Sequence, residues 1–267
     1  MEADSQLGPI VRESSAGCEG KARVGIWLAR CLGSRAITIE SAREIGKGSG
    51  CEVWDCLIGG EAMVLKVYGP GFDDYSGLGP VDTARKHALA LMELPVLGIP
   101  TPRCLGLAVE GAEAAIVMEK VVALSFSQAH RVEAARILAT LHSIETRDLS
   151  HELGDLVSRS TPNRGRVGQV PDEPTLGETA LQHGDYFSVN LAATEQGLRV
   201  LDWDLLATGD PMWDLGFLIE ADRGVGTAES AAVIAAYAAV RAVNRERLEW
   251  QRACWRAFWQ RRDQGTS

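Results

Sequence analysis

The chain has 267 residues, of which 46% are hydrophobic and 24% charged, and its formal net charge is −9. That length suffices for one large domain or two small lobes, and the composition is typical of a soluble globular protein. The acidic balance argues against a general nucleic-acid binder, which would carry a basic face, and weakly favours a cationic partner.

The cysteines and the apolar runs indicate in which cellular compartment the protein is expected. None of the six cysteines forms a C-x-x-C pair and no histidine lies at ligand spacing from them, so a zinc site is not expected. Cys104 and Cys254 stand in apolar surroundings, which predicts buried thiols in a reducing compartment. Residues 231–240 are too short to span a membrane, and the N-terminus lacks a signal pattern. We expect a cytoplasmic protein with neither a membrane nor a nucleic-acid partner.

The chain begins with a polar segment followed by an amphipathic pattern. Residues 1–20 contain glycine and show no periodicity, which predicts a loose tail. From Lys21 to Leu32 apolar residues recur at helical spacing and predict a short helix. Residues 36–39 and 43–45 are typical of short strands.

A glycine-rich turn comes next, in the run Ile45-Gly46-Lys47-Gly48-Ser49-Gly50-Cys51. Such a turn can lay backbone N–H groups over phosphates, because glycine lets the backbone come close. Gly46, Gly48 and Ser49 are therefore candidate nucleotide-binding residues. A plain hairpin turn explains Gly-Ser-Gly nearly as well and stays an alternative.

The following strand, residues 62–68, contains Lys66 among β-branched and apolar residues. An isolated lysine in a strand more commonly points outward from a half-exposed face. Its position after the glycine turn favours a role with phosphates. Residues 82–94 then show a helical pattern, and residues 114–119 indicate a buried strand that ends in a linker.

The second half of the chain is mainly helical by its apolar spacing. Helical patterns cover residues 130–142, 228–243 and 246–262. Residues 158–178 are rich in Pro, Gly, Arg and polar residues and predict a long surface loop.

The polar runs at 183–190 and 201–204 carry the chemistry. Asp185 is followed by Asn190, and Asp202 ends an apolar run. Phosphoryl transfer needs such a set, because one carboxylate accepts the proton of the incoming hydroxyl while an amide oxygen and a second carboxylate hold Mg²⁺. The alternative is two ordinary turns joined by a strand, since Asp and Asn are common turn formers.

With His183 before Asp185, and with the Gly-Asp-Pro-Met-Trp-Asp-Leu run at 209–215 after Asp202, this order resembles the aminoglycoside phosphotransferase family, a branch of the protein-kinase-like fold. The resemblance implies an α+β, bilobal fold with an N-terminal antiparallel sheet plus helix and a mainly helical C-terminal lobe. The predicted parts are a tail and short helix at 1–35, a nucleotide-binding lobe at 36–119 and a catalytic lobe at 120–267.

The resemblance also implies roles for the matching residues. Asp185 is the expected catalytic base, and Asn190 and Asp202 are the expected ligands of Mg²⁺. Lys66 would contact the α- and β-phosphates of ATP or GTP. The remaining implied roles are adenine recognition by backbone groups of Met118, Glu119 and Val121, and bracing of the catalytic loop by His183 and Asp214.

The sequence departs from the family pattern in two places. The third glycine of the phosphate loop falls on Cys51, with Gly50 one position early. The helix glutamate that pairs with the strand lysine falls on His87, which supplies no fixed negative charge at neutral pH, although Glu93 could serve if the helix were shifted. These departures keep open a nucleotide-binding module without catalysis.

The acceptor is expected to be a small molecule. Only a short loop separates Asp202 from Asp210, and no Ala-Pro-Glu segment of a protein kinase follows. Family resemblance suggests an aminoglycoside, whose amino groups Glu220 and Asp222 would meet; a solvated acidic helix end is the alternative. Macrolides, choline, homoserine and sugars stay open as acceptors. We expect a monomer or a weak dimer.

Overall fold

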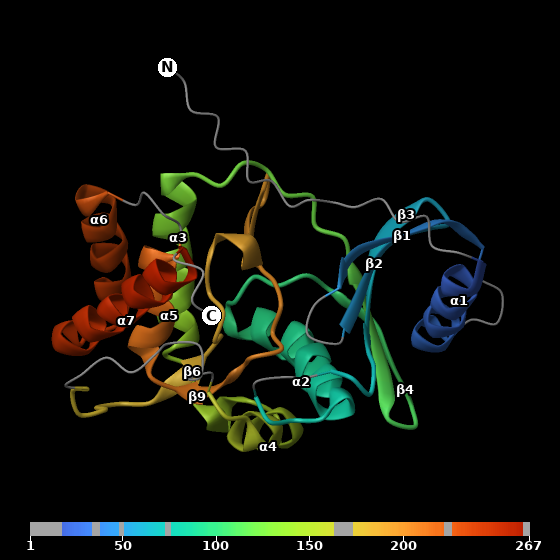
Figure 1. The fold of residues 1–267 in the computed structure, drawn as a ribbon, viewed down its shortest axis with the longest axis horizontal. Helices are drawn as coiled ribbons and strands as arrows, with labels where there is room; N and C mark the ends of the chain where they lie inside the picture. Colours follow the sequence, from blue (N-terminus) through green and yellow to red (C-terminus); the bar gives the residue numbers. More distant parts are fainter. Residues whose placement is uncertain are drawn as a thin grey trace. The chain divides into compact units, whose positions relative to one another are not determined.

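A computed structural model describes residues 18–33, 38–47, 51–72, 76–162, 173–221 and 226–263. The chain divides into two compact units, one of residues 1–73 and 104–120 and the other of residues 74–103 and 121–267 (Figure 1). None of the helices in the described part of the chain combines the length and the apolar content that crossing a membrane requires.

The first unit is a five-stranded antiparallel sheet with one helix packed on it. The strands lie in the order β1-β2-β3-β5-β4. Their bounds are Ile39–Lys47 for β1, Cys51–Ile58 for β2, Glu61–Tyr68 for β3, Cys104–Glu110 for β4 and Glu113–Glu119 for β5. Helix α1 (Cys18–Leu32) packs against β4 and β5.

Helix α1 covers one face of this sheet because its apolar side chains share one side. Val24, Trp27 and Leu28 are buried in a cluster with side chains of β2, β3 and β5, and each such burial contributes about 1.5–3 kcal/mol. The approach of α1 to β4 is close at Gly106, where a Cβ would lie 2.1 Å from the carbonyl oxygen of Cys31. Only glycine fits at this point without a shift of the backbone.

Strand β3 lies inside the sheet and places Lys66 on the face away from α1. Successive side chains of a strand alternate; Leu65 and Val67 enter the cluster under α1, so Lys66 points to the other side. Its residue is only 5% exposed, and its ammonium lies 5.3 Å from the ring centroid of Tyr68, within cation–π range. Lys66 is thus a buried cation and not an outward-pointing surface lysine.

The second unit is mainly helical. Its helices are α2 (Pro80–Glu93), α3 (Gln128–Leu141), α4 (His151–Arg159), α5 (Pro211–Glu220), α6 (Thr227–Ala238) and α7 (Arg245–Asp263). Two small antiparallel sheets pair β6 (Ala180–Gln182) with β9 (Ala207–Gly209) and β7 (Leu191–Thr194) with β8 (Gly197–Val200). Short 3₁₀ turns cover Leu94–Leu97 (η1), Thr146–Asp148 (η2) and Ser188–Asn190 (η3).

Helix α5 is the buried centre of this unit. All its residues except Glu220 are buried, and it packs against α3, α6, α7 and β6. A helix that is apolar all round belongs in a core. The ring of Phe217 stacks on Trp255 of α7 with centroids 3.9 Å apart. The helix therefore fixes the positions of the polar side chains in its first turns.

The predicted fold class is confirmed: the chain is α+β, with an N-terminal antiparallel sheet plus helix and a mainly helical remainder. Helix α2, which the predicted range 36–119 included with the sheet, groups with the second unit instead. Helix α4 was not expected, and its last residues overlap the loop predicted at 158–178. Gly48, Ser49, Asp222, most of the predicted tail and residues 163–172 lie outside the described residues.

Candidate active site

The loop after β6 is tied to helix α5 by the carboxylate of Asp214 and by the indole of Trp213. The N–H of His183 donates to Oδ2 of Asp214 at 2.7 Å, and the N–H of Gly184 donates to Oδ1 at 2.9 Å. The indole N–H of Trp213 donates to the carbonyl of Gly184 at 3.2 Å. Hydrogen bonds to an ionised acceptor are shorter and stronger than neutral ones. Two consecutive peptide groups are thus held immediately before Asp185.

Gly184 is required by the turn of this loop. Its φ is +87°, a conformation that side chains of L-residues rarely adopt, and a Cβ there would lie 2.8 Å from the Cβ of Leu205. The chain can therefore change direction just before Asp185 only with glycine at this position.

His183 links this loop to the segment that contains Asp202. Its Nδ1 accepts the N–H of Asp185 at 3.2 Å, so its Nε2 carries the proton and donates to the carbonyl of Leu201 at 2.8 Å. The ring is buried and lies 4.7 Å, centroid to centroid, from that of Trp203. The neutral imidazole is therefore a structural connector between the two polar runs.

Asp185 and Asn190 are in direct contact. The amide nitrogen of Asn190 donates to both the backbone oxygen and the Oδ2 carboxylate oxygen of Asp185, each at 2.9 Å. Because the nitrogen is used in this way, the amide oxygen is the atom of Asn190 that can face a hard cation. The backbone carbonyl of Asn190 accepts the N–H of Leu201 at 2.9 Å, which brings the residue before Asp202 beside it.

Asp202 has an unusual backbone. Its φ of +58° is the one positive value at a non-glycine residue among those that the structure describes. Such a conformation costs of order 1–3 kcal/mol and persists only where the surroundings hold it. This conformation changes the direction of the chain after β8. It does so directly after Leu201, whose N–H is bonded to the carbonyl of Asn190.

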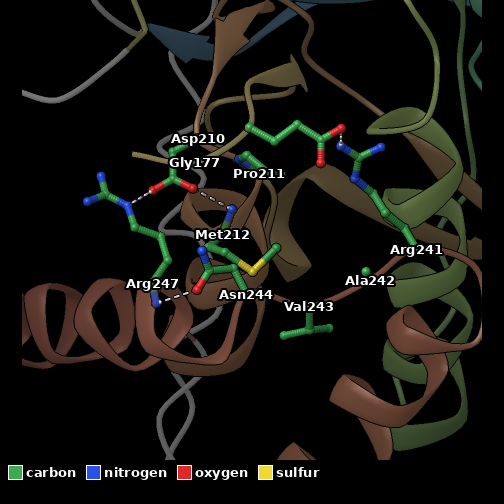
Figure 2. Close-up of a pocket in the computed structure, with 10 residues that line it drawn as sticks. Gly177, Asp210, Pro211, Met212, Arg241, Ala242, Val243, Asn244 and Arg247 are labelled. Atoms are coloured by element: carbon green, nitrogen blue, oxygen red, sulfur yellow. Dashed lines mark hydrogen bonds and ion pairs between the residues drawn. The ribbon is translucent and has the colours of Figure 1, made fainter. Parts of the chain in front are cut away.

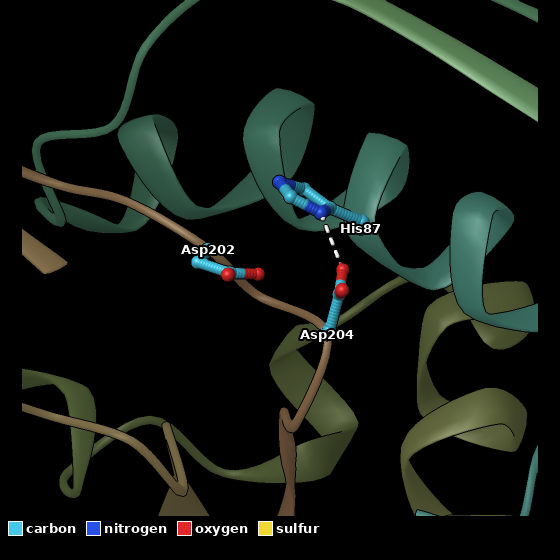
Figure 3. A group of neighbouring side chains, drawn as sticks. All are labelled: His87, Asp202 and Asp204. Carbon is cyan, nitrogen blue, oxygen red and sulfur yellow. Dashed lines mark hydrogen bonds and ion pairs between the residues drawn. The ribbon is translucent and has the colours of Figure 1, made fainter. Parts of the chain in front are cut away.

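His87 on α2 contacts the acid two positions after Asp202. Its Nδ1 lies 2.7 Å from Oδ1 of Asp204, and the His87 side chain is 1% exposed (Figure 3). His87, Asp202 and Asp204 each offer a donor atom within 4.8 Å of the others. The residue at the position where the resemblance expects a glutamate is thus an imidazole bonded to an aspartate of the segment that contains Asp202.

Glu93, the other acid considered on α2, has a different partner. Its carboxylate accepts the hydroxyl of Ser150 at 2.6 Å and the N–H of Ser150 at 2.8 Å. Ser150 is the N-cap of α4. Glu93 therefore joins the end of α2 to the start of α4.

The residues predicted to bind the nucleotide fall mainly in the first unit. Gly46 lies in β1 and Lys66 in β3. Met118 pairs with both Val64 and Cys104, so its backbone lies within the sheet ladder, and Glu119 ends β5. Val121 belongs to the second unit. Their contacts with a nucleotide stay predictions.

Glu220, predicted to meet an amino group of the acceptor, is already ion-paired. Its Oε1 accepts Nε of Arg252 at 2.6 Å and Nη1 of Arg256 at 2.8 Å. Two guanidinium groups more than balance one carboxylate, so Glu220 does not present a lone negative charge. The other predicted acid, Asp222, lies outside the described residues.

A cavity of about 240 Å³ opens beside the start of α5 (Figure 2). Its charged walls are paired internally: Arg247 Nε lies 2.5 Å from Asp210 Oδ2, and Arg241 Nη2 lies 2.8 Å from Glu178 Oε1. Asp210 also caps α5 by accepting the N–H of Met212. This cavity is lined by structural ion pairs and holds none of the predicted site residues.

Two residues that help to hold the loop before Asp185, Trp213 and His142, were not assigned this role from the sequence. Trp213 donates to the loop itself, and His142 Nε2 lies 3.4 Å from Oδ2 of Asp214 while its Nδ1 lies 2.7 Å from the hydroxyl of Tyr237. Burial lowers the pKa of His142, and Asp214 opposes this shift. His142 and Asp214 are 72 residues apart in sequence, so no local pattern indicates that they are partners.

Comparison with known proteins places these features in a family. Structures with the same fold include the macrolide 2′-phosphotransferase MphH from Brachybacterium faecium (15% identity, TM-score 0.63, covering 92% of this chain and 93% of that one). A spectinomycin phosphotransferase solved with ADP and spectinomycin has 12% identity and a TM-score of 0.64, with 89% and 84% covered. The amicoumacin kinase hAmiN, solved with AMP-PNP, Ca²⁺ and Ami, has 11% identity and a TM-score of 0.63, with 91% and 86% covered.

A search of curated proteins finds no match. At these identities the solved structures establish the fold alone. The model of the phosphotransferase enzyme family (APH) matches residues 41–251, which include every described residue of the two polar runs. The chain belongs to the phosphotransferase enzyme family.

Proposed function

We propose that this phosphotransferase moves the γ-phosphate of ATP or GTP to a hydroxyl group of a small molecule, with Asp185 as the general base. The observation that carries the proposal is the contact between Asp185 and Asn190 on a loop whose preceding peptide groups are held by Asp214. Phosphoryl transfer depends mostly on positioning and charge neutralisation, so a rigid carboxylate at the acceptor hydroxyl is the required element.

The donor set suits a hard divalent cation. Asn190 offers its amide oxygen, because its nitrogen is used by Asp185, and Asp202 offers a carboxylate from the adjoining segment. Mg²⁺ prefers such oxygen ligands and takes few of them from protein. When bound, the ion would neutralise charge on the phosphates. Asn190 and Asp202 would hold it, while Asp185 orients the acceptor hydroxyl and accepts its proton.

The nucleotide itself would lie with its phosphates against the glycine turn and Lys66. A buried ammonium on the face of the sheet opposite α1 supports this role for Lys66. Gly46, Gly48 and Ser49 would supply backbone contacts to phosphates. Backbone groups of Met118, Glu119 and Val121 would take the base edge.

The acceptor proposed first is an aminoglycoside-type antibiotic, in keeping with the family resemblance and the net charge of −9. The similar structures described above are a macrolide phosphotransferase, a spectinomycin phosphotransferase and an amicoumacin kinase, which supports a hydroxylated antibiotic more broadly. The ion pairs of Glu220 with two arginines weigh against that residue as a ligand of amino groups. Choline, homoserine and sugars are the alternatives.

The proposed compartment is the cytoplasm, where ATP is available. The five cysteines for which the structure describes a side chain are all free thiols, which accords with a reducing compartment.

The test is release of ADP or GDP with Mg²⁺ and a panel of aminoglycosides, macrolides, choline and homoserine. Asp185→Asn should lower the turnover of the active acceptor by about 10²–10⁴-fold, because it removes the general base. Asp202→Ala should abolish turnover by removing a metal ligand. Asp155→Asn makes the same chemical change at a mainly exposed residue of α4 and should have no effect.

Two results would count against the proposal. Turnover that is unchanged in Asp185→Asn would exclude the assigned base. Binding of Mg-nucleotide without release for any acceptor would favour a nucleotide-binding module that does not catalyse.

A further inference from the structure

His87, Asp202 and Asp204 bring an imidazole and two carboxylates together (Figure 3). One donor atom of each lies within 4.8 Å of the other two. The imidazole comes from the middle of α2, whereas both carboxylates come from the segment after β8, and His87 and Asp204 are 117 residues apart in sequence. Three ligands of these two types are enough to hold a metal ion.

We propose that these three side chains form a binding site for a divalent first-row transition-metal ion, represented by Mn²⁺, which binds without nucleotide. Oxygen donors suit Mg²⁺, whereas an imidazole nitrogen moves the preference toward transition metals. This inference deepens the proposed function, because Asp202 is also the proposed ligand of the nucleotide-associated Mg²⁺. The histidine at the helix-glutamate position is then a determinant of metal choice.

The distances fit one ion between His87 and Asp204. Their donor atoms Nδ1 and Oδ1 are 2.7 Å apart. Two ligands each about 2.1 Å from an ion, at roughly right angles, lie about 3 Å from one another. An ion at Nδ1 takes the place of the hydrogen-bond proton, which moves to Nε2 so that the ring stays neutral, and this exchange needs a movement of roughly a few tenths of an ångström.

Both side chains are held before any ion arrives. The His87 side chain is 1% exposed and the Asp204 side chain 13% exposed. His87 lies on the buried face of α2, with Ala88 and Leu91. Ligands that packing already orients give tighter and more selective sites. Mg²⁺ loses its water reluctantly, so a mixed-donor set in which His87 and Asp204 are buried disfavours it relative to Mn²⁺.

The test is a titration of the full-length chain with Mn²⁺ in the absence of nucleotide, following the electron paramagnetic resonance signal of free Mn²⁺. We expect one ion per chain, with a Kd at least about tenfold lower than that of Mg²⁺ measured by competition. His87→Gln removes the imidazole and should raise the Kd for Mn²⁺ at least about tenfold. The matched control, His151→Gln, changes an exposed histidine of α4 and should leave the Kd unchanged.

A second measurement keeps the proposal testable if His87→Gln does not fold. In the unmodified chain, bound Mn²⁺ should show ¹⁴N modulation in electron spin echo spectra, because one ligand is an imidazole. No nucleotide-independent binding, no ¹⁴N modulation, or an unchanged Kd in folded His87→Gln would each overturn the site.

The two proposals fail separately. Absence of phosphoryl transfer with Mg²⁺, together with Mn²⁺ binding that depends on His87, would overturn the proposed function and leave the metal site. Transfer with Mg²⁺, together with no Mn²⁺ binding in the absence of nucleotide, would overturn the metal site alone.

Discussion

Asp210 and Asp214 lie one turn apart at the start of α5, and both are buried, but their carboxylates have different partners. Asp210 accepts from two side chains of α7: Arg247 at 2.5 Å (Figure 2) and Gln251 at 2.6 Å. Asp214 accepts from backbone N–H groups of the loop that precedes Asp185. One acid joins two helices, whereas the other holds the loop of the proposed base.

The difference shows how one helix serves both the fold and the site. A carboxylate paired with buried side chains contributes to stability and to the position of α7. A carboxylate that receives backbone donors fixes the path of a loop. We therefore expect loss of Asp210 to act mainly on the free energy of unfolding and loss of Asp214 to act mainly on turnover.

The largest effect is expected for Asp210→Ala, on the free energy of unfolding. Removing one partner of a buried ion pair leaves Arg247, whose side chain is 3% exposed, without its nearest acid and costs about 3–5 kcal/mol. The remaining contact of Arg247 with Glu173 places the value toward the lower end. Urea denaturation measures it. Asp82→Ala breaks the exposed pair with Arg159 and serves as control, with a change of at most about 1 kcal/mol.

Asp214→Asn should lower kcat about 10²-fold, since an amide cannot accept both N–H groups and a small displacement of the loop misplaces the base. Steady-state kinetics on the folded variant measure the change in kcat, with Asp210→Asn as the comparison variant. The assignment of the two acids would have to be exchanged if Asp210→Asn reduced kcat more than Asp214→Asn did.

Gly184→Ala separates crowding at the loop from backbone strain. Gly184 and Gly98 have nearly equal φ values of +87° and +86°, but a Cβ on Gly184 meets Leu205 at 2.8 Å whereas a Cβ on Gly98 meets nothing within 4 Å. Both variants carry the strain, and Gly184→Ala adds overpacking worth roughly 1–3 kcal/mol. Thermal unfolding of Gly184→Ala and Gly98→Ala compares their losses of stability. Equal losses would show that the loop yields to the added methyl group.

The smallest effect concerns pH and His142. Its folded pKa is lowered by burial, so the unfolded chain binds more protons below the ordinary histidine value of 6.5. Stability should be fully present above that value and should fall as pH decreases, by at most about 1.4 kcal/mol per pH unit from one group. His142→Gln should flatten the dependence between pH 7 and pH 5, as followed by urea denaturation. The control, His151→Gln at an exposed position, should leave the pH dependence unchanged. An equal flattening in this control would show that His142 is not the cause of the pH dependence.

Local patterns were sufficient for most elements. The apolar spacing at residues 82–94, 130–142 and 246–262 predicted α2, α3 and α7 within two residues at each end. Strand β3 with Lys66 was also located from its composition. Strands β6 and β9 have three residues each, which is too short for periodicity, and α4 lies in a stretch that no pattern marked.

The order Asp185, Asn190, Asp202 was visible in the sequence, because phosphoryl transfer restricts which side chains can follow one another at a turn and at a strand end. Chain order also indicated the family. What the sequence did not indicate was the partner of each charge. His87 was noted as a replaced glutamate, but its bond to Asp204 spans 117 positions.

Apolar periodicity was enough for most helices and strands, since this signal is local. The family resemblance carried by a few polar residues supplied the fold class and the candidate base and metal ligands. Folding assigned the partners: backbone donors to Asp214, two arginines to Glu220, and an imidazole to Asp204. Such pairs depend on distances between segments that only the packed helices set. The sequence therefore indicates which kinds of side chain form the candidate site. The packing of the segments decides which of these charged groups are already paired within the protein.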